Sequence, residues 1–427
     1  MEKSKKRGIS GLFTHREMDI PFLLIVLTIL TVGIIMLFSA SYTYAAYYKG
    51  GSTYYFIRQS VYACIGVAGM LIISKIDYKY LKPLCPIGFG IAGLLLVAVL
   101  FLPEVVPGFK RWILIPGIGL TFQPSEVAKM MLIMYCAWSM DRNGSLITSK
   151  KRSKRLYDLT KGRVIMQART SSAFYYGGVV GITSVLVFLE SHLSGTILML
   201  TIGIVMLYLG GFNKWWFIII GGGAVLVIAA VVIKPELLPS DYMTERIVAW
   251  KQEDYDPMGA RWQINQSLYA IGSGGLLGTG LGNSMQKHLY VSEPQNDFIF
   301  SIVCEELGFV GSSIILVLFA LLVWRGVHIG INAKDRFGAL LAMGMSFQVG
   351  LQVFLNVAVV TDTVPNTGIG LPFFSAGGTS LCILLAEMGV VLGVSRYSGI
   401  NKLGRSKKKE DTQEITAVKA NKAEGAV

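Results

Sequence analysis

Asp297 is the residue whose type and position most clearly suggest chemistry. It follows the polar tripeptide 294–296 and directly precedes an apolar run that begins at Phe298. A charge at the edge of a membrane segment is costly and is usually kept for a function. Because partial desolvation raises the pKa of a carboxyl group, Asp297 could act as a general base near neutral pH. An Asp at this place could equally cap a helix, and residue chemistry alone leaves both interpretations open.

The stretch 266–297, which leads to Asp297, is rich in glycine. Its spacing does not match G-x-G-x-x-G, no strand-then-helix pattern surrounds it and no Walker A motif is present, so we exclude a nucleotide site. Glycine lets backbone segments approach closely, and we interpret these glycines as close packing around a substrate groove. Gln286, Lys287 and His288 belong to the same stretch and are expected to line the cleft of Asp297.

The segment FQPSEVAK, residues 122–129, begins a predicted helix. Glu126 and Lys129 lie three positions apart on one helix face, so an ion pair is expected. Two interpretations stay open: the pair only holds the helix in place, or Lys129 helps to bind an anionic lipid headgroup. Arg111, in the preceding loop, suits phosphate because its planar guanidinium can donate paired hydrogen bonds.

Further basic residues, Arg246, Lys251 and Arg261, flank two tryptophans in the long segment 234–297. Arginine and phosphate form strong charge-assisted hydrogen bonds, so these residues could hold a diphosphate. Basic residues with tryptophans are also typical of an amphipathic segment at a membrane interface. The pattern supports both interpretations.

A proline- and glycine-rich motif, PNTGIGLPFFSAGGTSL, occupies 365–381. Proline and glycine exclude a plain helix here. Non-helical backbone at membrane depth must line a cavity or be buried in protein. We therefore expect Ser375, Thr379 and Ser380 to offer hydroxyl groups to a bound substrate.

Other ionisable residues interrupt apolar sequence. Glu190 and His192 stand between two predicted helices, and His192 is expected to be a hydrogen-bonded structural histidine rather than a metal ligand. Glu305, Glu306 and Glu387 lie within predicted spans, where buried pairing is expected. No HExxH or comparable ligand spacing occurs, so the sequence predicts no metal site.

The composition indicates the scaffold that must position these residues. The chain has 427 residues, of which 53% are hydrophobic and 15% charged, whereas about 25% are charged in soluble domains. Repeated long apolar runs predict an all-α polytopic membrane protein, and the alternation of a β-barrel is missing.

The net charge of +13 is concentrated in particular loops and the tail, which argues against a nucleic-acid partner. Five cysteines without a CxxC pair indicate neither a disulfide framework nor a zinc site.

The apolar runs predict about ten transmembrane helices. Their approximate bounds are 20–41, 55–74, 84–102, 124–140, 174–190, 193–211, 216–233, 298–324, 337–360 and 379–396. Both termini then lie on one side, and that side is cytoplasmic because its segments hold 29 of the 39 Lys and Arg residues. We expect basic loops to contact anionic membrane lipids. We expect a basic cytoplasmic N-terminus (1–19), a membrane domain (20–396) and a disordered cytoplasmic basic tail (397–427). The membrane domain contains a cytoplasmic basic loop (141–173) and a large extracellular loop between spans seven and eight (234–297).

These motifs together resemble the SEDS family of bacterial envelope proteins, which includes FtsW, RodA and SpoVE. The resemblance rests on FQPSE with its following lysine, QSLYAIGSGGLLGTGLGNS, EPQNDFIFSIVCEELG and TGIGLPFFSAGGTSL, in family order across 20–400. Residues 281–284 and 293–297 look closer to the FtsW and SpoVE branch than to RodA. Residues 190–192 read Glu-Ser-His where Gln-Pro-Asp is common, and residues 375–378 read Ser-Ala-Gly-Gly where Ser-Tyr-Gly-Gly is common.

The resemblance implies a peptidoglycan glycosyltransferase in the bacterial cytoplasmic membrane, at the division septum. Such an enzyme polymerises lipid II, a disaccharide-pentapeptide on undecaprenyl diphosphate, at the outer face. Its expected partners are a class B penicillin-binding protein and other divisome proteins. The essential aspartate of the family corresponds to Asp297, and its Glu–Lys pair corresponds to Glu126 and Lys129.

The expected reaction is an inverting transfer with Asp297 as the base. A diphosphate leaves as a stabilised anion, so cationic groups can replace a general acid. Lys129, Arg246 and Arg111 are the candidates, in falling order. No cofactor is required, although a divalent cation, Mg²⁺ or Mn²⁺, is an alternative source of positive charge. The rival functions are a lipid II flippase and a non-catalytic divisome scaffold that activates the penicillin-binding protein.

Overall fold

A computed structural model describes residues 16–105, 110–115, 120–143, 163–212, 214–237, 241–252, 256, 258–259 and 261–398. Parts of the predicted regions lie outside them, namely residues 1–15 of the N-terminus, 144–162 of the basic loop, 238–240, 253–255, 257 and 260 of the large loop, and 399–427 of the tail.

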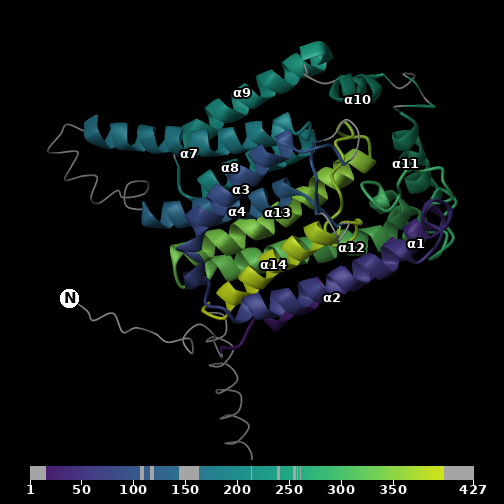
Figure 1. The fold of residues 1–427 in the computed structure, drawn as a ribbon, viewed down its shortest axis with the longest axis horizontal. Helices are drawn as coiled ribbons and strands as arrows, with labels where there is room; N and C mark the ends of the chain where they lie inside the picture. The colour runs from purple at the N-terminus through teal and green to yellow at the C-terminus, as the bar shows by residue number, and fades with distance from the viewer. Residues whose placement is uncertain are drawn as a thin grey trace, which may run out of the picture.

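Ten long helices form the described part of the protein, one for each predicted apolar run (Figure 1). They are α1 (Ile20–Lys49), α2 (Tyr54–Lys75), α3 (Leu84–Phe101), α4 (Pro124–Arg142), α7 (Arg163–Leu189), α8 (Leu193–Leu209), α9 (Lys214–Ile233), α12 (Ile299–Ile331), α13 (Arg336–Val360) and α14 (Gly378–Ser395). Six of the described helices, α1, α2, α3, α12, α13 and α14, are long and apolar enough to cross a membrane. The protein is therefore a multi-pass membrane protein, while ten spans and two cytoplasmic termini stay predictions.

Local sequence explains where several helices begin. The side chain of Asp19 accepts a hydrogen bond from the backbone N–H of Phe22 at the start of α1, and Asp335 accepts one from Gly338 at the start of α13. Such caps satisfy donors that a helix end leaves free. Pro124 begins α4, where its missing N–H is not needed.

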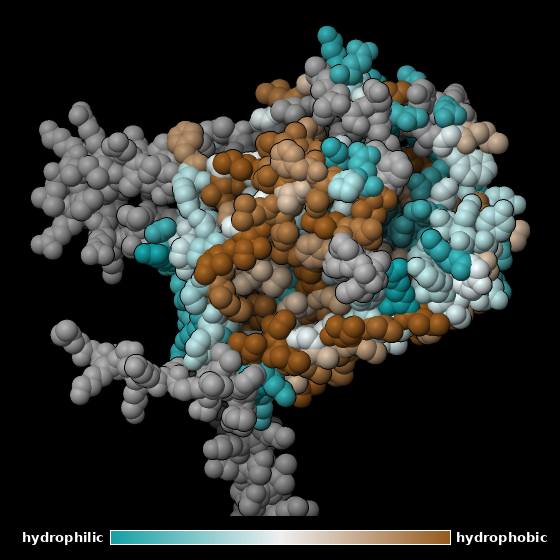
Figure 2. All heavy atoms as spheres, viewed as in Figure 1, coloured by the Kyte–Doolittle hydropathy of each residue, from teal (hydrophilic) through white to brown (hydrophobic). Residues whose placement is uncertain are grey.

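The long helices run side by side and form a bundle. In it α2 packs on α14, α12 on α13, and α3 on α4. Figure 2 shows a broad apolar surface around the middle of the molecule, with polar residues gathered towards both ends. This distribution suits a bundle whose middle is surrounded by lipid tails.

Three regions predicted to be loops contain regular structure. An antiparallel hairpin of β1 (Ile113–Ile115) and β2 (Leu120–Phe122) precedes α4, so the all-α prediction was incomplete. The long segment between α9 and α12 contains α10 (Asp241–Lys251), α11 (Trp262–Ser273) and the 3-10 helix η3 (Pro235–Leu237). A second 3-10 helix, η2 (Tyr78–Leu81), follows α2. These elements are too short to produce the long apolar runs on which the prediction of helices depended.

Helix α12 is broken at Gly308, whose φ of 66° and ψ of −170° are not helical. The glycine-rich segment (274–282) packs its backbone against this break. There the backbone N–H of Thr279 donates to the carbonyl oxygen of Glu305 at 2.9 Å. At the break, backbone N–H and C=O groups of α12 that lack partners within the helix form hydrogen bonds with the glycine-rich segment instead.

Close contact explains why glycine is needed in this segment. A Cβ on Gly278 would lie 2.2 Å from the carbonyl oxygen of Glu306, and one on Gly308 would lie 2.3 Å from the backbone nitrogen of Gly278. Both glycines also have positive φ angles. The close packing predicted from the sequence therefore occurs at Gly278, where the partner is α12, and packing around a substrate groove stays a prediction.

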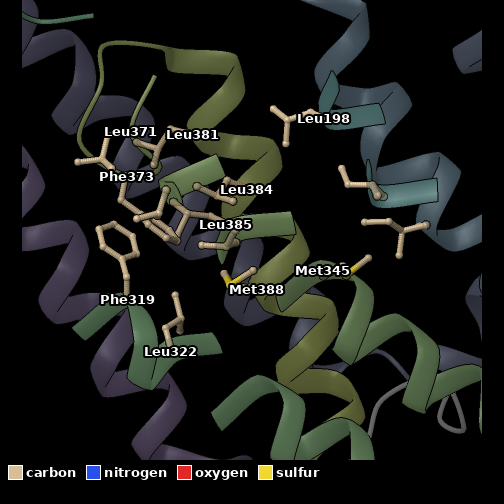
Figure 3. Packing of buried hydrophobic residues seen from close by; sticks show 14 of the residues in the cluster. Leu198, Phe319, Leu322, Met345, Leu371, Phe373, Leu381, Leu384, Leu385 and Met388 are labelled. Carbon is tan, nitrogen blue, oxygen red and sulfur yellow. The ribbon is translucent and has the colours of Figure 1, made fainter. Parts of the chain in front are cut away.

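The segment between α13 and α14, residues 361–377, turns back into the bundle; we call it the re-entrant segment. Phe373 and Phe374 are buried, and their rings lie 6.4 and 6.0 Å from the ring of Phe319 in α12. Figure 3 shows Phe373 directed at Phe319. A Cβ on Gly33, near the middle of α1, would lie 2.5 Å from the carbonyl oxygen of Phe373. The prediction that this non-helical segment is buried in protein is confirmed.

Candidate functional site

Asp297 lies half-buried in the turn that precedes α12. Its carboxyl pKa is raised above the ordinary value, mainly because burial removes water from the charged form. The positive charges of Arg246 and Arg111 oppose the shift, and the negative charge of Glu293 adds to it. Asp297 therefore combines partial dehydration with a pKa moved towards neutral pH, which suits a general base.

Two arginines from distant parts of the chain act on this carboxyl group through their positive charge. Arg246, on α10, donates from Nη1 to the backbone oxygen of Asn366 at 2.8 Å and to its Oδ1 at 3.0 Å. A Cβ on Gly368 would lie 3.2 Å from Oδ2 of Asp297 and 3.9 Å from Nη1 of Arg246, so both groups border the same small space. Arg111, before β1, acts on Asp297 through its charge.

A small cavity adjoins this space. Its lining residues come from the segment before β1, from the α7–α8 turn and the first residue of α8, from α10 and from the re-entrant segment. They are Arg111, Ser191, Leu193, Arg246, Ile247, Pro365, Asn366 and Thr367. Its two arginine side chains carry donors of the kind that bind an anionic group such as a diphosphate.

Two polar side chains, Asn356 and Ser375, hold the turn at Asp297 against the re-entrant segment. Asn356, fully buried in α13, donates from Nδ2 to the backbone oxygens of Asp297 and Ile369, each at 2.7 Å. Ser375 donates from Oγ to the backbone oxygen of Asn296 at 2.7 Å. Ser375 therefore contributes to the position of the turn. Our sequence reasoning missed Asn356, although an amide within an apolar run was an available signal.

The predicted ion pair of Glu126 and Lys129 is present, with 2.8 Å between Oε1 and Nζ. Both side chains are largely buried, Ser380 donates to Glu126 at 3.1 Å, and the charge of Lys129 also faces Glu387. Thr379 donates at 3.3 Å to a backbone oxygen of β2. This cluster lies among α4, α13 and α14, so Lys129 is already neutralised by carboxylates. A part for Lys129 in holding a diphosphate stays a prediction.

Lys287 occupies a different place from the one predicted. Its Nζ lies 2.9 Å from Oε1 of Glu306 and 3.2 Å from Oγ of Ser39 in α1, and the side chain is buried. Its ammonium therefore ties the glycine-rich region to α12 and α1 and does not face the cleft of Asp297. The prediction of buried pairing for Glu306 is confirmed.

The neighbours of Lys287 also contact the helices. The backbone N–H of Gln286 lies 3.4 Å from the carboxylate of Glu305, whose Oε1 accepts a bond from the backbone N–H of Met285 at 2.8 Å. His288 is exposed, with 3.0 Å between its Nδ1 and Oγ1 of Thr43 in α1. A part for Gln286 and His288 in substrate binding stays a prediction.

Glu190 and His192 lie buried in the turn between α7 and α8. Neither carboxylate oxygen of Glu190, nor Nδ1 of His192, has a hydrogen-bond partner among the described residues. Burial raises the pKa of Glu190 to about 8 against the opposing charge of Arg111, and burial lowers the pKa of His192 well below its usual value. The hydrogen bond predicted for His192 is therefore not made by its Nδ1.

Comparison with known proteins finds relatives that match most of the chain. A family model described as cell cycle protein, for FtsW, RodA and SpoVE, matches residues 20–400. The chain is 37% identical over 383 residues to stage V sporulation protein E of Bacillus subtilis (strain 168), covering 89% of this chain and 97% of that protein. It is 36% identical over 381 residues to the probable peptidoglycan glycosyltransferase FtsW of Geobacter sp. (strain M18), covering 88% and 96%.

Solved structures show the same fold. A chain of a peptidoglycan synthase complex superposes with a TM-score of 0.67 at 24% identity, covering 89% of this chain and 98% of that one. The rod shape determining protein RodA of Thermus thermophilus superposes with a TM-score of 0.57 at 24% identity, covering 89% and 97%. Because the family model and the sequence relatives cover most of its length, the chain belongs to the FtsW/RodA/SpoVE family of cell cycle proteins.

Proposed function

We propose that this protein is a peptidoglycan glycosyltransferase that polymerises lipid II at the outer face of the cytoplasmic membrane. The observation that carries the proposal is the half-buried carboxyl group of Asp297, with its raised pKa, beside the guanidinium of Arg246. Relatives that match nearly the whole chain are named probable peptidoglycan glycosyltransferases, which supports the same activity here.

In the proposed reaction Asp297 accepts the proton of the acceptor sugar's 4-hydroxyl group. The acceptor oxygen then forms a bond to the anomeric carbon of the donor. The bond between that carbon and the diphosphate oxygen breaks with its electron pair on oxygen, and undecaprenyl diphosphate leaves. Attack opposite the leaving group inverts the anomeric centre, and a single base is sufficient because the diphosphate leaves as an anion.

The leaving diphosphate gathers negative charge as its bond breaks, so nearby cations stabilise the transition state. Arg246 and Arg111 fit this task because both line the cavity beside Asp297 and neither sits in the buried Glu126–Lys129 cluster. Asn366 accepts hydrogen bonds from Arg246 and thereby restrains its guanidinium. A divalent cation, Mg²⁺ or Mn²⁺, stays an alternative source of positive charge.

The decisive experiment is polymerisation of lipid II by the purified full-length protein, with and without its cognate penicillin-binding protein. One positioned base contributes about 10²–10⁴-fold in rate, so Asp297→Asn should nearly abolish polymer while the protein remains folded. Arg336→Gln is the matched control, because Arg336 bonds the backbone of Gly210 in a connection between α8 and α9. Equal polymerisation by wild type and Asp297→Asn would sink the assignment.

The same preparations separate the rival functions. A flippase would move labelled lipid II across vesicles without making polymer. A scaffold would retain partner binding and support growth when it carries Asp297→Asn. Either pattern would replace the enzymatic proposal.

We infer in addition that the protein works with a class B penicillin-binding protein and other divisome proteins at the septum. The similar chain of known structure belongs to a peptidoglycan synthase complex described as coordinating polymerisation and crosslinking. Relatives named FtsW and SpoVE support a part in division or sporulation. Copurification from membranes and septal fluorescence of a tagged chain test this inference.

A further inference from the structure

Five tyrosines form a continuous row where α1 ends and α2 begins. In the order Tyr47, Tyr48, Tyr44, Tyr55 and Tyr54, successive ring centroids lie 4.9, 4.6, 6.3 and 5.1 Å apart. We call these five residues the tyrosine row. Aromatic rings interact at such separations, so the row is one connected surface rather than a set of isolated exposed side chains.

One side of the tyrosine row adjoins the candidate active site. The hydroxyl group of Tyr44 donates to the carboxylate of Glu293 at 3.4 Å, and Tyr55 lies next to Gln295. Glu293 and Gln295 come four and two residues before Asp297. The inner rings therefore touch the segment that carries the candidate base.

The other side of the row reaches the surface of the molecule. Tyr47 and Tyr48 are 71% and 58% exposed, whereas Tyr44 and Tyr55 are half-buried. The ends of α1 and α2 that carry these rings lie at one end of the bundle, where Figure 2 shows polar residues. The two inner rings thus lie beside the segment before Asp297, and exposed rings continue from them on both sides, through Tyr48 to Tyr47 and to Tyr54, which is 37% exposed.

Tyrosine has the chemistry to bind a glycan. A sugar ring presents C–H groups on its faces and hydroxyl groups at its edge, while a tyrosine offers a flat apolar ring and a polar hydroxyl group. Tyrosine also has few rotatable bonds, so ordering it costs little entropy. A row of connected rings can contact successive sugars of one strand.

Each transfer lengthens the product by one disaccharide, and the strand must pass over a surface beside Asp297. We propose that the tyrosine row binds the nascent glycan strand as it leaves the active site. This inference rests on the proposed function. Tyrosines also occur at membrane interfaces, but an interfacial belt does not require rings joined to one another and to the segment before Asp297.

The test compares two double variants with one control in vesicles that contain the full-length protein. Tyr47→Ala with Tyr48→Ala removes the exposed rings, and Tyr47→Trp with Tyr48→Trp keeps aromatic faces. Tyr208→Ala is the control, because Tyr208 is 70% exposed but lies at the end of α8 that leads into α9. The measurements are the length distribution of glycan made from labelled lipid II, and binding of a soluble peptidoglycan oligosaccharide that lacks the undecaprenyl chain.

The proposal predicts that the double alanine variant makes strands at most about half as long and binds the oligosaccharide at least about tenfold more weakly. The double tryptophan variant should recover both properties, and Tyr208→Ala should change neither. The proposal would be overturned if the double alanine variant kept the strand length and the oligosaccharide binding of wild type. It would also be overturned if Tyr208→Ala lost strand length and binding to the same extent, because that would indicate a general effect of interfacial tyrosines. If wild type makes no polymer, the proposed function fails, and oligosaccharide binding alone still decides the part of the row.

Discussion

The side-chain amide of Asn356 donates a 2.7 Å hydrogen bond to the backbone carbonyl oxygen of Asp297. The same nitrogen donates to the carbonyl oxygen of Ile369 in the re-entrant segment, also at 2.7 Å. One fully buried residue of α13 therefore joins the candidate base to the segment that borders its cavity. Because both acceptors are backbone atoms, the amide sets the position of Asp297 without contacting its carboxyl group.

Replacing Asn356 should lower turnover more than substrate binding. Asn356→Asp keeps the shape but loses the amide donor, and a lost buried hydrogen bond costs about 1–3 kcal/mol. Tenfold in rate corresponds to about 1.4 kcal/mol, so we expect kcat for lipid II polymerisation to fall about tenfold or more while KM changes less. Asn332→Asp is the matched control, because Asn332 donates to His328 at the other end of α12. Wild-type turnover in Asn356→Asp would contradict a positioning role.

The pH dependence of polymerisation should report the raised pKa of Asp297. The base acts only when ionised, so kcat should fall as pH decreases through a pKa above the ordinary value of about 3.9. Arg246 lowers this pKa and Glu293 raises it. The acidic limb of the kcat profile should therefore move to higher pH in Arg246→Gln and to lower pH in Glu293→Gln. Shifts in the same direction, or none, would show that another group controls the profile.

Asp297→Asn should be at least as stable as wild type at pH 7. A carboxyl group whose pKa is raised on folding disfavours the folded state when it is ionised, and this cost disappears as pH falls through the folded and then the unfolded pKa. Asparagine removes the cost at every pH. The unfolding temperature in detergent should therefore be equal or higher for the variant at pH 7, with the difference shrinking towards about pH 4. A variant that is clearly less stable at pH 7 would mean that the carboxylate makes a stabilising contact.

Lys287→Met should destabilise the protein strongly. It leaves Glu306 buried without its ammonium partner, and removing one member of a buried pair costs about 3–5 kcal/mol. Lys287→Met with Glu306→Gln should recover part of this loss in detergent unfolding. Lys82→Met is the control, since the Lys82–Asp141 pair is partly exposed, with 2.8 Å between its charged atoms, and such pairs contribute about 0–1 kcal/mol. Equal losses in the two lysine variants would refute a special role for the buried pair.

Gly278→Ala should also be damaging, because its Cβ would lie 2.2 Å from the backbone of α12 and its φ is +82°. A strained backbone position costs about 1–3 kcal/mol before any clash is added. Gly272→Ala is the matched control, since a Cβ there meets nothing within 4 Å. The prediction is checked by unfolding in detergent, where only Gly278→Ala should lose stability. If both variants behave alike, the contact with α12 does not explain the glycine.

Part of this architecture could be predicted because it depends on local sequence. Apolar runs long enough to cross a membrane predicted each of the ten long helices among the described residues, since run length and polarity decide burial in lipid. The Glu126–Lys129 pair was predictable because a spacing of three residues places both on one helix face. The half-buried state of Asp297 followed from its place beside an apolar run.

The sequence by itself thus determined the helices, the re-entrant segment and the residue suited to act as a base. Only the tertiary structure decided which distant groups meet: Arg246 and Asn356 at Asp297, and Lys287 at Glu306 instead of the cleft. It also showed that α12 breaks at Gly308 to receive the glycine-rich segment. Local periodicity describes one helix at a time, whereas these contacts depend on how helices pack. For this reason the partners of Asp297 could not be derived from the residues around it.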